Sequence, residues 1–89
     1  MAKLVFTQQL RRFTEVPEID THATRLRDAL EVAFTANPRL RGYILDDQGH
    51  LRPHVVVFID GGRIRDRVGL NDRLQANSSV HVLQALSGG

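Results

Sequence analysis

The chain has 89 residues, 42% apolar and 25% charged, which fits one small globular domain with a single core. It has no cysteine, which excludes disulfides, thiolate metal sites and a cysteine nucleophile, and no apolar run long enough to cross a membrane. The formal net charge is only +2, and eleven of the twelve basic residues are arginines interspersed with ten acids, which favours a solvated surface over a nucleic-acid-binding one. No signal sequence is recognisable at the N-terminus, so we expect a cytoplasmic protein.

The N-terminal residues predict a β-hairpin. Residues 3–7 are rich in β-branched and aromatic side chains and are expected to form the first strand. Residues 8–12 would then turn the chain into a short second strand at 13–16. Pro17 would end that strand or mark it as an edge, because proline cannot donate to a sheet ladder.

A helix is predicted next, with Asp20 or Thr21 as its N-cap, because either side-chain oxygen can accept a hydrogen bond from the first turn. The helix would end at about Ala36, since the residue before Pro38 is pushed out of the α region. Its apolar side chains recur at three- and four-residue spacings and form one stripe, made by Ala23, Leu26, Ala29, Leu30, Ala33 and Phe34.

The segment after the helix carries turn signals. We expect residues 39–45 to form an extended arm and residues 46–49 to form a turn. Leu51 and Arg52 would then lead the chain back from that turn. Residues 54–59 give the strongest strand signal in the chain. They are apolar on both faces, which is typical of an interior strand of a mixed sheet with one face covered by the helix.

The remaining elements are short until the last strand. A tight turn, a short strand, an irregular or 3₁₀ stretch and a second turn are expected at residues 60–62, 63–65, 69–74 and 77–78. The last strand, residues 79–86, divides its apolar side chains between two faces: Val80, Val82 and Leu86 on one, Leu83 and Ala85 on the other. One helix covers only one face of so small a sheet, so part of this surface would be left for a partner. The alternative is an ordinary scatter of exposed apolar atoms.

Gly88 and Gly89 follow the last strand with only Ser87 between them. Glycine has no Cβ, so such a segment could thread into a narrow slot of a partner and adopt any backbone angle there. This suits a protein whose C-terminal carboxylate is the reacting group. Frayed termini also tolerate glycine, so the pair gains weight only from the fold that precedes it.

The element order β-β-α-β-β-β with a Gly-Gly end resembles the ubiquitin-like β-grasp, and more closely the ThiS/MoaD family of sulfur carriers. In that family a central apolar strand turns through a glycine-bearing loop, passes an I-R and a G-L segment, and ends as V-x-x-x-x-A-x-x-G-G. The matching residues here are 51–65, Gly69-Leu70, Leu74 and 79–89. The resemblance implies an α+β fold, with a mixed sheet packed on one main helix. Residues 1–86 would form the β-grasp domain and residues 87–89 a flexible tail.

The resemblance also implies a chemistry. A ubiquitin-activating-like adenylyltransferase would use ATP to adenylate the Gly89 carboxylate, which would become a thiocarboxylate and donate sulfur to a downstream synthase. The chain would bind no cofactor, hold no metal and act as a protein co-substrate, so it would not itself be an enzyme. Gly88 and Ser87 would form the tail that enters the partner.

Docking residues are expected beside that tail. Phe58, Val56 and Leu83 would form an apolar docking face, unless the helix covers that side of the sheet. The other expected docking residues are Ala85 and Leu86, which would anchor the last strand, and Arg63, Arg65 and Arg67, which would form a polar rim. For the arginines, a simple solvated face is an equal alternative, because exposed ion pairs contribute only about 0–1 kcal/mol.

The sulfur acceptor stays open. The segment 39–53 is longer than in the shortest family members and resembles the subgroup whose partners make cysteine or related sulfur metabolites, where a metalloprotease is also a partner. Molybdopterin, thiazole and a sulfur-containing siderophore are the other candidates.

The sequence also allows other functions. A ubiquitin-like modifier joined to lysines through Gly89 would share the first chemical steps. A small nucleic-acid-binding domain is disfavoured, because Phe58 is the only aromatic residue in its strand and could not stack successive bases. A metal site at His50, His54 and the Asp46-Asp47 pair lacks any recognised ligand spacing.

Overall fold

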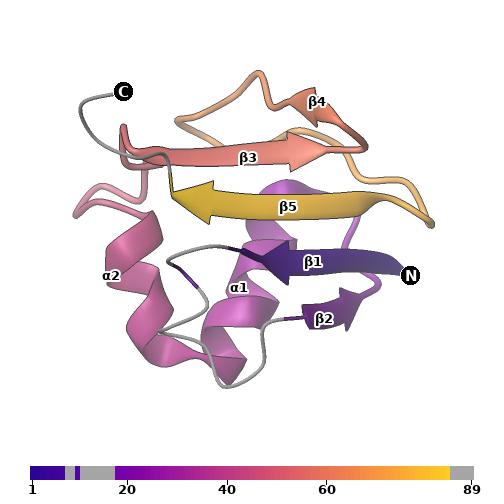
Figure 1. Cartoon of the computed structure of the whole chain (residues 1–89), viewed down its shortest axis with the longest axis horizontal. Helices are drawn as coiled ribbons and strands as arrows, with labels where there is room; N and C mark the ends of the chain where they lie inside the picture. The colour runs from indigo at the N-terminus through magenta and orange to yellow at the C-terminus, as the bar shows by residue number, and fades with distance from the viewer. Residues whose placement is uncertain (8–9, 11–17, 85–89) are drawn as a thin grey trace.

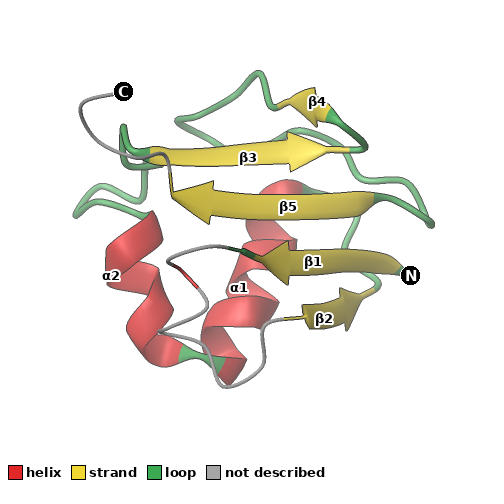
Figure 2. Ribbon diagram, in the orientation of Figure 1, coloured by secondary structure: helices red, strands yellow, loops and turns green. Residues whose placement is uncertain are grey.

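A computed structural model gives the fold and describes residues 1–7, 10 and 18–84. Five strands form one mixed sheet in the order β2-β1-β5-β3-β4 (Figure 1). The strands are β1 (Ala2–Phe6), β2 (Glu18–Thr21), β3 (Val55–Ile59), β4 (Gly62–Arg63) and β5 (Ser79–Gln84). The helical segments between β2 and β3 are α1 (Leu26–Ala36), the 3₁₀ segment η2 (Pro38–Leu40) and α2 (Arg41–Ile44). Figure 2 draws helices in red and strands in yellow. The predicted α+β class, with a mixed sheet on one main helix, is confirmed.

The last strand occupies the middle of the sheet. β5 pairs in parallel with β1, with Leu4 opposite Val80, and antiparallel with β3, with Val57 opposite Val82. The outer strands β2 and β4 pair antiparallel with β1 and β3. β3 is therefore an interior strand, as its apolar sequence predicts.

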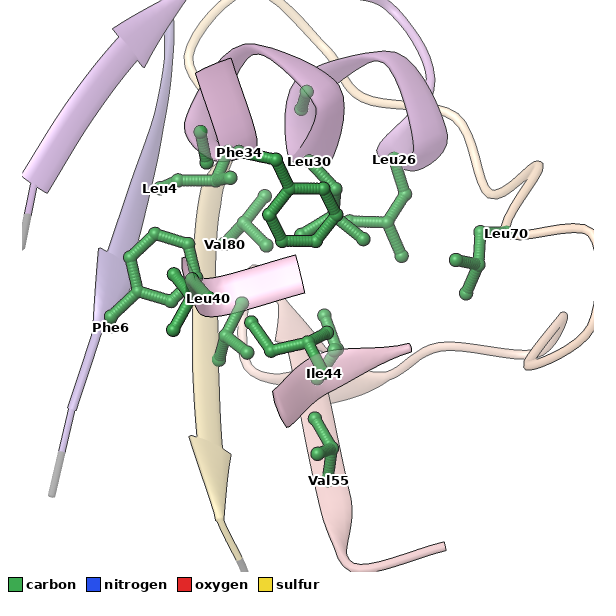
Figure 3. Packing of buried hydrophobic residues seen from close by; sticks show 14 of the residues in the cluster. Leu4, Phe6, Leu26, Leu30, Phe34, Leu40, Ile44, Val55, Leu70 and Val80 are labelled. Carbon is green, nitrogen blue, oxygen red and sulfur yellow. The ribbon is translucent and has the colours of Figure 1, made fainter. Parts of the chain in front are cut away.

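The core lies between the sheet and α1. In Figure 1, α1 lies behind the sheet, and β5 passes in front of it. Alternate strand residues point toward the helix and are buried, because successive side chains of a strand point to opposite faces. Figure 3 shows several of these packing against the helical residues. The buried set includes Leu4, Phe6, Val55, Val57, Val80 and Val82 from the sheet, and Leu26, Ala29, Leu30, Ala33 and Phe34 from α1. Each large side chain contributes roughly 1.5–3 kcal/mol by leaving water.

The start of the helix differs from the prediction. Asp20 and Thr21 lie in β2, paired with Lys3 and Ala2, and the helix begins only at Leu26. Its N-cap position makes no side-chain hydrogen bond. Instead, two N–H groups of the first turn donate to backbone carbonyl oxygens of residues 70 and 72, at 2.9 Å each. A neighbouring loop thus replaces the expected side-chain cap. The second strand predicted at 13–16 lies outside the described residues.

The predicted extended arm is also wrong in its first part. Residues 38–44 are helical rather than extended, and Leu40 and Ile44 are fully buried, so they extend the core beyond α1. The turn predicted at 46–49 is present and is closed by an isolated β-bridge between Leu45 and Leu51. Of the segment 39–52, only the turn at 46–49 and the chain that returns beside Leu45 match the prediction.

The turn between β3 and β4 is a two-residue hairpin loop. Asp60 and Gly61 have φ angles of 51° and 85°, and Ile59 pairs directly with Gly62 across the loop. Two successive positive φ angles match the right-handed twist of the strands, which explains the Asp-Gly sequence. β4 ends at Arg63, so it is shorter than predicted. Residues 69–74 are irregular, and β5 begins at the expected residue.

Candidate functional site

The sheet has one face that no described helix covers. We call it the open face and define it by the residues that point away from α1: Lys3, Val5, Val56, Phe58, Arg63, His81 and Leu83. Val56 pairs with Leu83, and Phe58 pairs with His81. Directly paired residues share a face of the sheet, so the structure brings Val56, Phe58 and Leu83 together. All three are half-buried.

The sequence left undecided which face the helix would cover. α1 packs on the side of Val55 and Val57, so Val56 and Phe58 remain on the other side. The candidate docking residues of β3 and β5 therefore form a continuous, partly exposed apolar surface. Their role in docking stays a prediction.

The three candidate rim arginines lie in different places. The Arg63 guanidinium carbon lies 6.0 Å from the centroid of the Phe58 ring, at the edge of the open face. Arg65 is exposed in the following loop. Arg67 donates from its guanidinium to the Arg52 carbonyl oxygen at 2.7 Å, which ties two loops together. Arg63 therefore borders the open face, while Arg67 is engaged between two loops. The role of the three arginines in docking stays a prediction.

β5 carries the chain from the centre of the sheet toward the predicted tail. Its last described residue, Gln84, pairs with Val55 at the start of β3. Leu83, one residue earlier, is part of the open face. The remaining candidates Ala85, Leu86, Ser87, Gly88 and Gly89 lie outside the described residues.

The loop after β4 is organised by two carboxylates that the sequence reasoning did not single out. Asp66 accepts hydrogen bonds from the backbone N–H groups of Gly69 and Val68, at 2.8 and 3.2 Å. Asp72 accepts from the N–H groups of Arg65 and Asp66, both at 2.9 Å. Hydrogen bonding, first from Gly69, lowers the pKa of Asp66 below its ordinary 3.8. An aspartate three residues before a glycine was the available signal.

Arg27 is the second organiser that sequence reasoning missed. Its guanidinium donates to the carbonyl oxygens of Gly69, Gly49 and Val68, at 2.8, 3.0 and 3.1 Å. It thereby fastens α1 to the turn at 46–49 and to the loop after β4. In the sequence Arg27 lies off the apolar stripe and looks like any solvated helix residue, so no local signal marked it.

The described part of the chain holds no cluster of metal-ligating side chains. No three His, Asp or Glu side chains gather there at metal-binding distance. His50 instead donates its backbone N–H to Asp46, and this bond is the main cause that lowers the pKa of Asp46. No described helix is long and apolar enough to span a bilayer.

Comparisons with known proteins agree with this architecture. The chain is similar to a chain of the BexX/CysO complex of Amycolatopsis orientalis, with a TM-score of 0.84, 13% identity and 100% of both chains covered. It is similar to SAMP1 of Haloferax volcanii, with a TM-score of 0.80, 21% identity, and 99% of this chain and 98% of that chain covered.

A third solved structure is the small archaeal modifier protein 1 of Methanosarcina acetivorans. Its TM-score is 0.80 at 24% identity, with 99% of this chain and 95% of that chain covered. No protein-family model and no curated protein sequence matches the chain. The chain has the ubiquitin-like β-grasp fold that is shared by ThiS/MoaD-type proteins.

Proposed function

We propose that this protein is a sulfur carrier whose Gly89 carboxylate is adenylated and converted to a thiocarboxylate. One observation carries the proposal. β5 supplies Leu83 to the open face and continues, after Gln84, into a segment that ends in Gly88 and Gly89. A partner seated on the open face would therefore meet the chain that leads to the reacting group.

The reach of the tail supports this arrangement. Five residues follow Gln84, and five extended residues span at most about 18 Å. An activating enzyme could thus hold the open face at one site and receive Gly89 at a separate catalytic site. Gly88 and Gly89 lack Cβ atoms, so the tail could lie in a channel too narrow for other residues.

The chemistry belongs to the partner enzymes. A carboxylate oxygen of Gly89 attacks the α-phosphorus of ATP, and pyrophosphate leaves. A persulfide of a partner then attacks the acyl carbon, and AMP leaves. Cleavage of the resulting acyl disulfide by a thiol leaves Gly89 as the thiocarboxylate. The carrier itself supplies no acid, base or cofactor, so it is a co-substrate of cytoplasmic, ATP-using enzymes.

A second candidate is a protein modifier that is joined to lysine side chains through Gly89. The similarity to small archaeal modifier protein 1 favours it. Both functions begin with adenylation of the same carboxylate, so they differ only in the nucleophile that receives the acyl group. For the sulfur carrier, the acceptor would be an enzyme that makes cysteine or a related metabolite, molybdopterin or thiazole, and a metalloprotease would be a further partner in the cysteine case.

Intact-protein mass spectrometry separates the two. The chain is co-expressed with a ubiquitin-activating-like enzyme and a sulfur source. A mass gain equal to the replacement of one oxygen by sulfur, located at Gly89, supports the carrier. Peptides that join Gly89 to lysines of other proteins support the modifier. An unmodified carboxylate, under conditions that load a control carrier, contradicts both.

A variant of the tail provides the matched control. Gly89→Leu is expected to abolish ATP–pyrophosphate exchange, because the side chain crowds the reacting carbonyl. Ser87→Ala, two residues earlier, keeps a small side chain and is expected to exchange normally. Equal exchange by the wild type and Gly89→Leu would contradict the proposed site.

A further inference from the structure

One cross-strand row of side chains runs through all five strands of the sheet. Strand register pairs Glu18 with Val5, Val5 with His81, His81 with Phe58, and Phe58 with Arg63. Paired residues share a face, so the row crosses the open face from edge to edge. Along the row the side chains are acidic, apolar, histidine, apolar and basic, and the histidine lies on the central strand.

This row is complementary to itself. A two-fold rotation about an axis parallel to β5, passing over His81, exchanges the two edges of the sheet. It would place Glu18 of one copy opposite Arg63 of the other, and Val5 opposite Phe58. Self-complementarity of this kind is what a two-fold interface requires. The two sheets would then pack with nearly aligned strands, as sheets that stack face to face commonly do.

We propose that two copies of this protein associate through their open faces, as a two-fold dimer centred on His81. Leu83 follows two residues later on β5, so it also lies near the axis and meets its own copy. Val56 lies beside it on β3. The half-buried apolar side chains of the open face are thereby covered by the open face of a second copy.

The charges at the two edges fit this arrangement. At the β2 edge, the described strand residues 2–6 and 18–21 hold two carboxylates, Glu18 and Asp20, and one cationic side chain, Lys3, whose Nζ lies 3.6 Å from the Glu18 carboxylate. These two strands together therefore carry one more acidic than basic side chain. At the other edge, Arg63 contacts the Phe58 ring and makes no ion pair within the described part of the chain. In the dimer, the acidic side chains at the β2 edge of each copy face the Arg63 guanidinium of the other copy.

The area of the open face indicates what kind of association is possible. Five strands about 4.8 Å apart and a six-residue central strand give a face of about 20 by 20 Å, or about 400 Å² per copy. Stable interfaces cover about 800 Å² per partner. The dimer is therefore weak and reversible. Because it covers the open face, it also competes with any other partner for that surface.

Charge reversal tests the dimer through sedimentation equilibrium of the full chain at low ionic strength. Arg63→Glu and Glu18→Arg are each expected to lower the association constant about tenfold, since each places like charges together at two symmetric sites. The double variant exchanges the charges and is expected to regain the wild-type constant. Single variants that associate as the wild type does, or a double variant that stays monomeric, overturn the proposal.

Crosslinking tests the position of the axis. The chain has no cysteine, so His81→Cys introduces the only thiol. Facing sheets lie about 10 Å apart, so a short bis-maleimide can join the two copies at this site. Asp47→Cys is the control, because this exposed residue lies in the turn away from the open face. Faster dimer formation by His81→Cys, slowed by added Arg63→Glu, supports the proposal, and equal rates for the two cysteines overturn it.

Discussion

The Arg27 guanidinium on α1 donates from Nε to the carbonyl oxygen of Gly69 at 2.8 Å. The same side chain also donates to Gly49 and Val68, so one arginine holds two loops against the helix. Arg27→Ala is expected to lower the free energy of unfolding by about 1–3 kcal/mol, because partly buried carbonyls lose a charged donor. Guanidinium chloride denaturation would measure this.

The control for that prediction is another arginine without such contacts. Arg39 is exposed, so Arg39→Ala is expected to change the free energy of unfolding by less than about 0.5 kcal/mol. If both variants lose the same stability, the three hydrogen bonds of Arg27 do not hold the loops.

The lowered pKa of Asp66 predicts a pH dependence of stability. In the unfolded chain the carboxyl group titrates near 3.8, and in the folded chain it titrates lower. The ionised group therefore stabilises the fold above pH 3.8, and this stabilisation is lost as the pH falls through the folded pKa. Asp66→Asn removes the ionisation. We expect the variant to be less stable than the wild type at neutral pH and to lose less stability on acidification. Thermal unfolding across the acid range checks this, and parallel curves would contradict it.

Two adjacent glycines should respond differently to the same change. Gly61 has a φ of 85°, where an L residue costs about 1–2 kcal/mol, so Gly61→Ala is expected to lower the free energy of unfolding by that amount. Gly62 pairs with Ile59 in the ladder, and an added Cβ would meet only the Ile59 carbonyl oxygen at an ordinary 3.7 Å. Gly62→Ala should therefore be close to neutral. Chemical denaturation of both variants measures the difference, and equal losses would argue against the hairpin geometry.

The open face should matter for activation of the tail. Leu83→Asp places a charge on its apolar part, and we expect at least tenfold lower kcat/KM for adenylation by the activating enzyme. Val32→Asp is the control, because Val32 is 42% exposed on α1, on the other side of the sheet. Pyrophosphate exchange with both variants checks the prediction once circular dichroism shows that each is folded. Equal loss in both would exclude a specific role for the open face.

The sequence predicted the features that depend on local chemistry. The Asp60-Gly61 turn, the end of α1 before Pro38 and the start of β5 all follow from residues whose backbone preferences act over a few positions. The helix start was wrong for an instructive reason. Asp20 and Thr21 are good N-caps, yet their backbone pairs with β1, a partner distant in sequence.

Two further features were decided only by tertiary packing. The strand Val55–Ile59 is apolar throughout, so its sequence alone could not say which face α1 would cover. The segment Pro38–Ile44 was too short to show helical periodicity, although Leu40 and Ile44 stand four residues apart and both are buried. Periodicity needs longer segments than this to separate helix from extended arm.

The parallel pairing of β1 with β5 has a mechanical consequence. The two strands lie side by side from the Lys3–Ser79 pair to the Phe6–Val82 pair. A pull applied at the start of β1 and beyond the end of β5 acts along both strands in opposite directions. It loads the interstrand hydrogen bonds in shear, all at once, instead of opening them one after another. A protein motor that pulls on the chain after Gln84, while the start of β1 is held, must therefore break the β1–β5 hydrogen bonds in the middle of the sheet before an outer strand detaches.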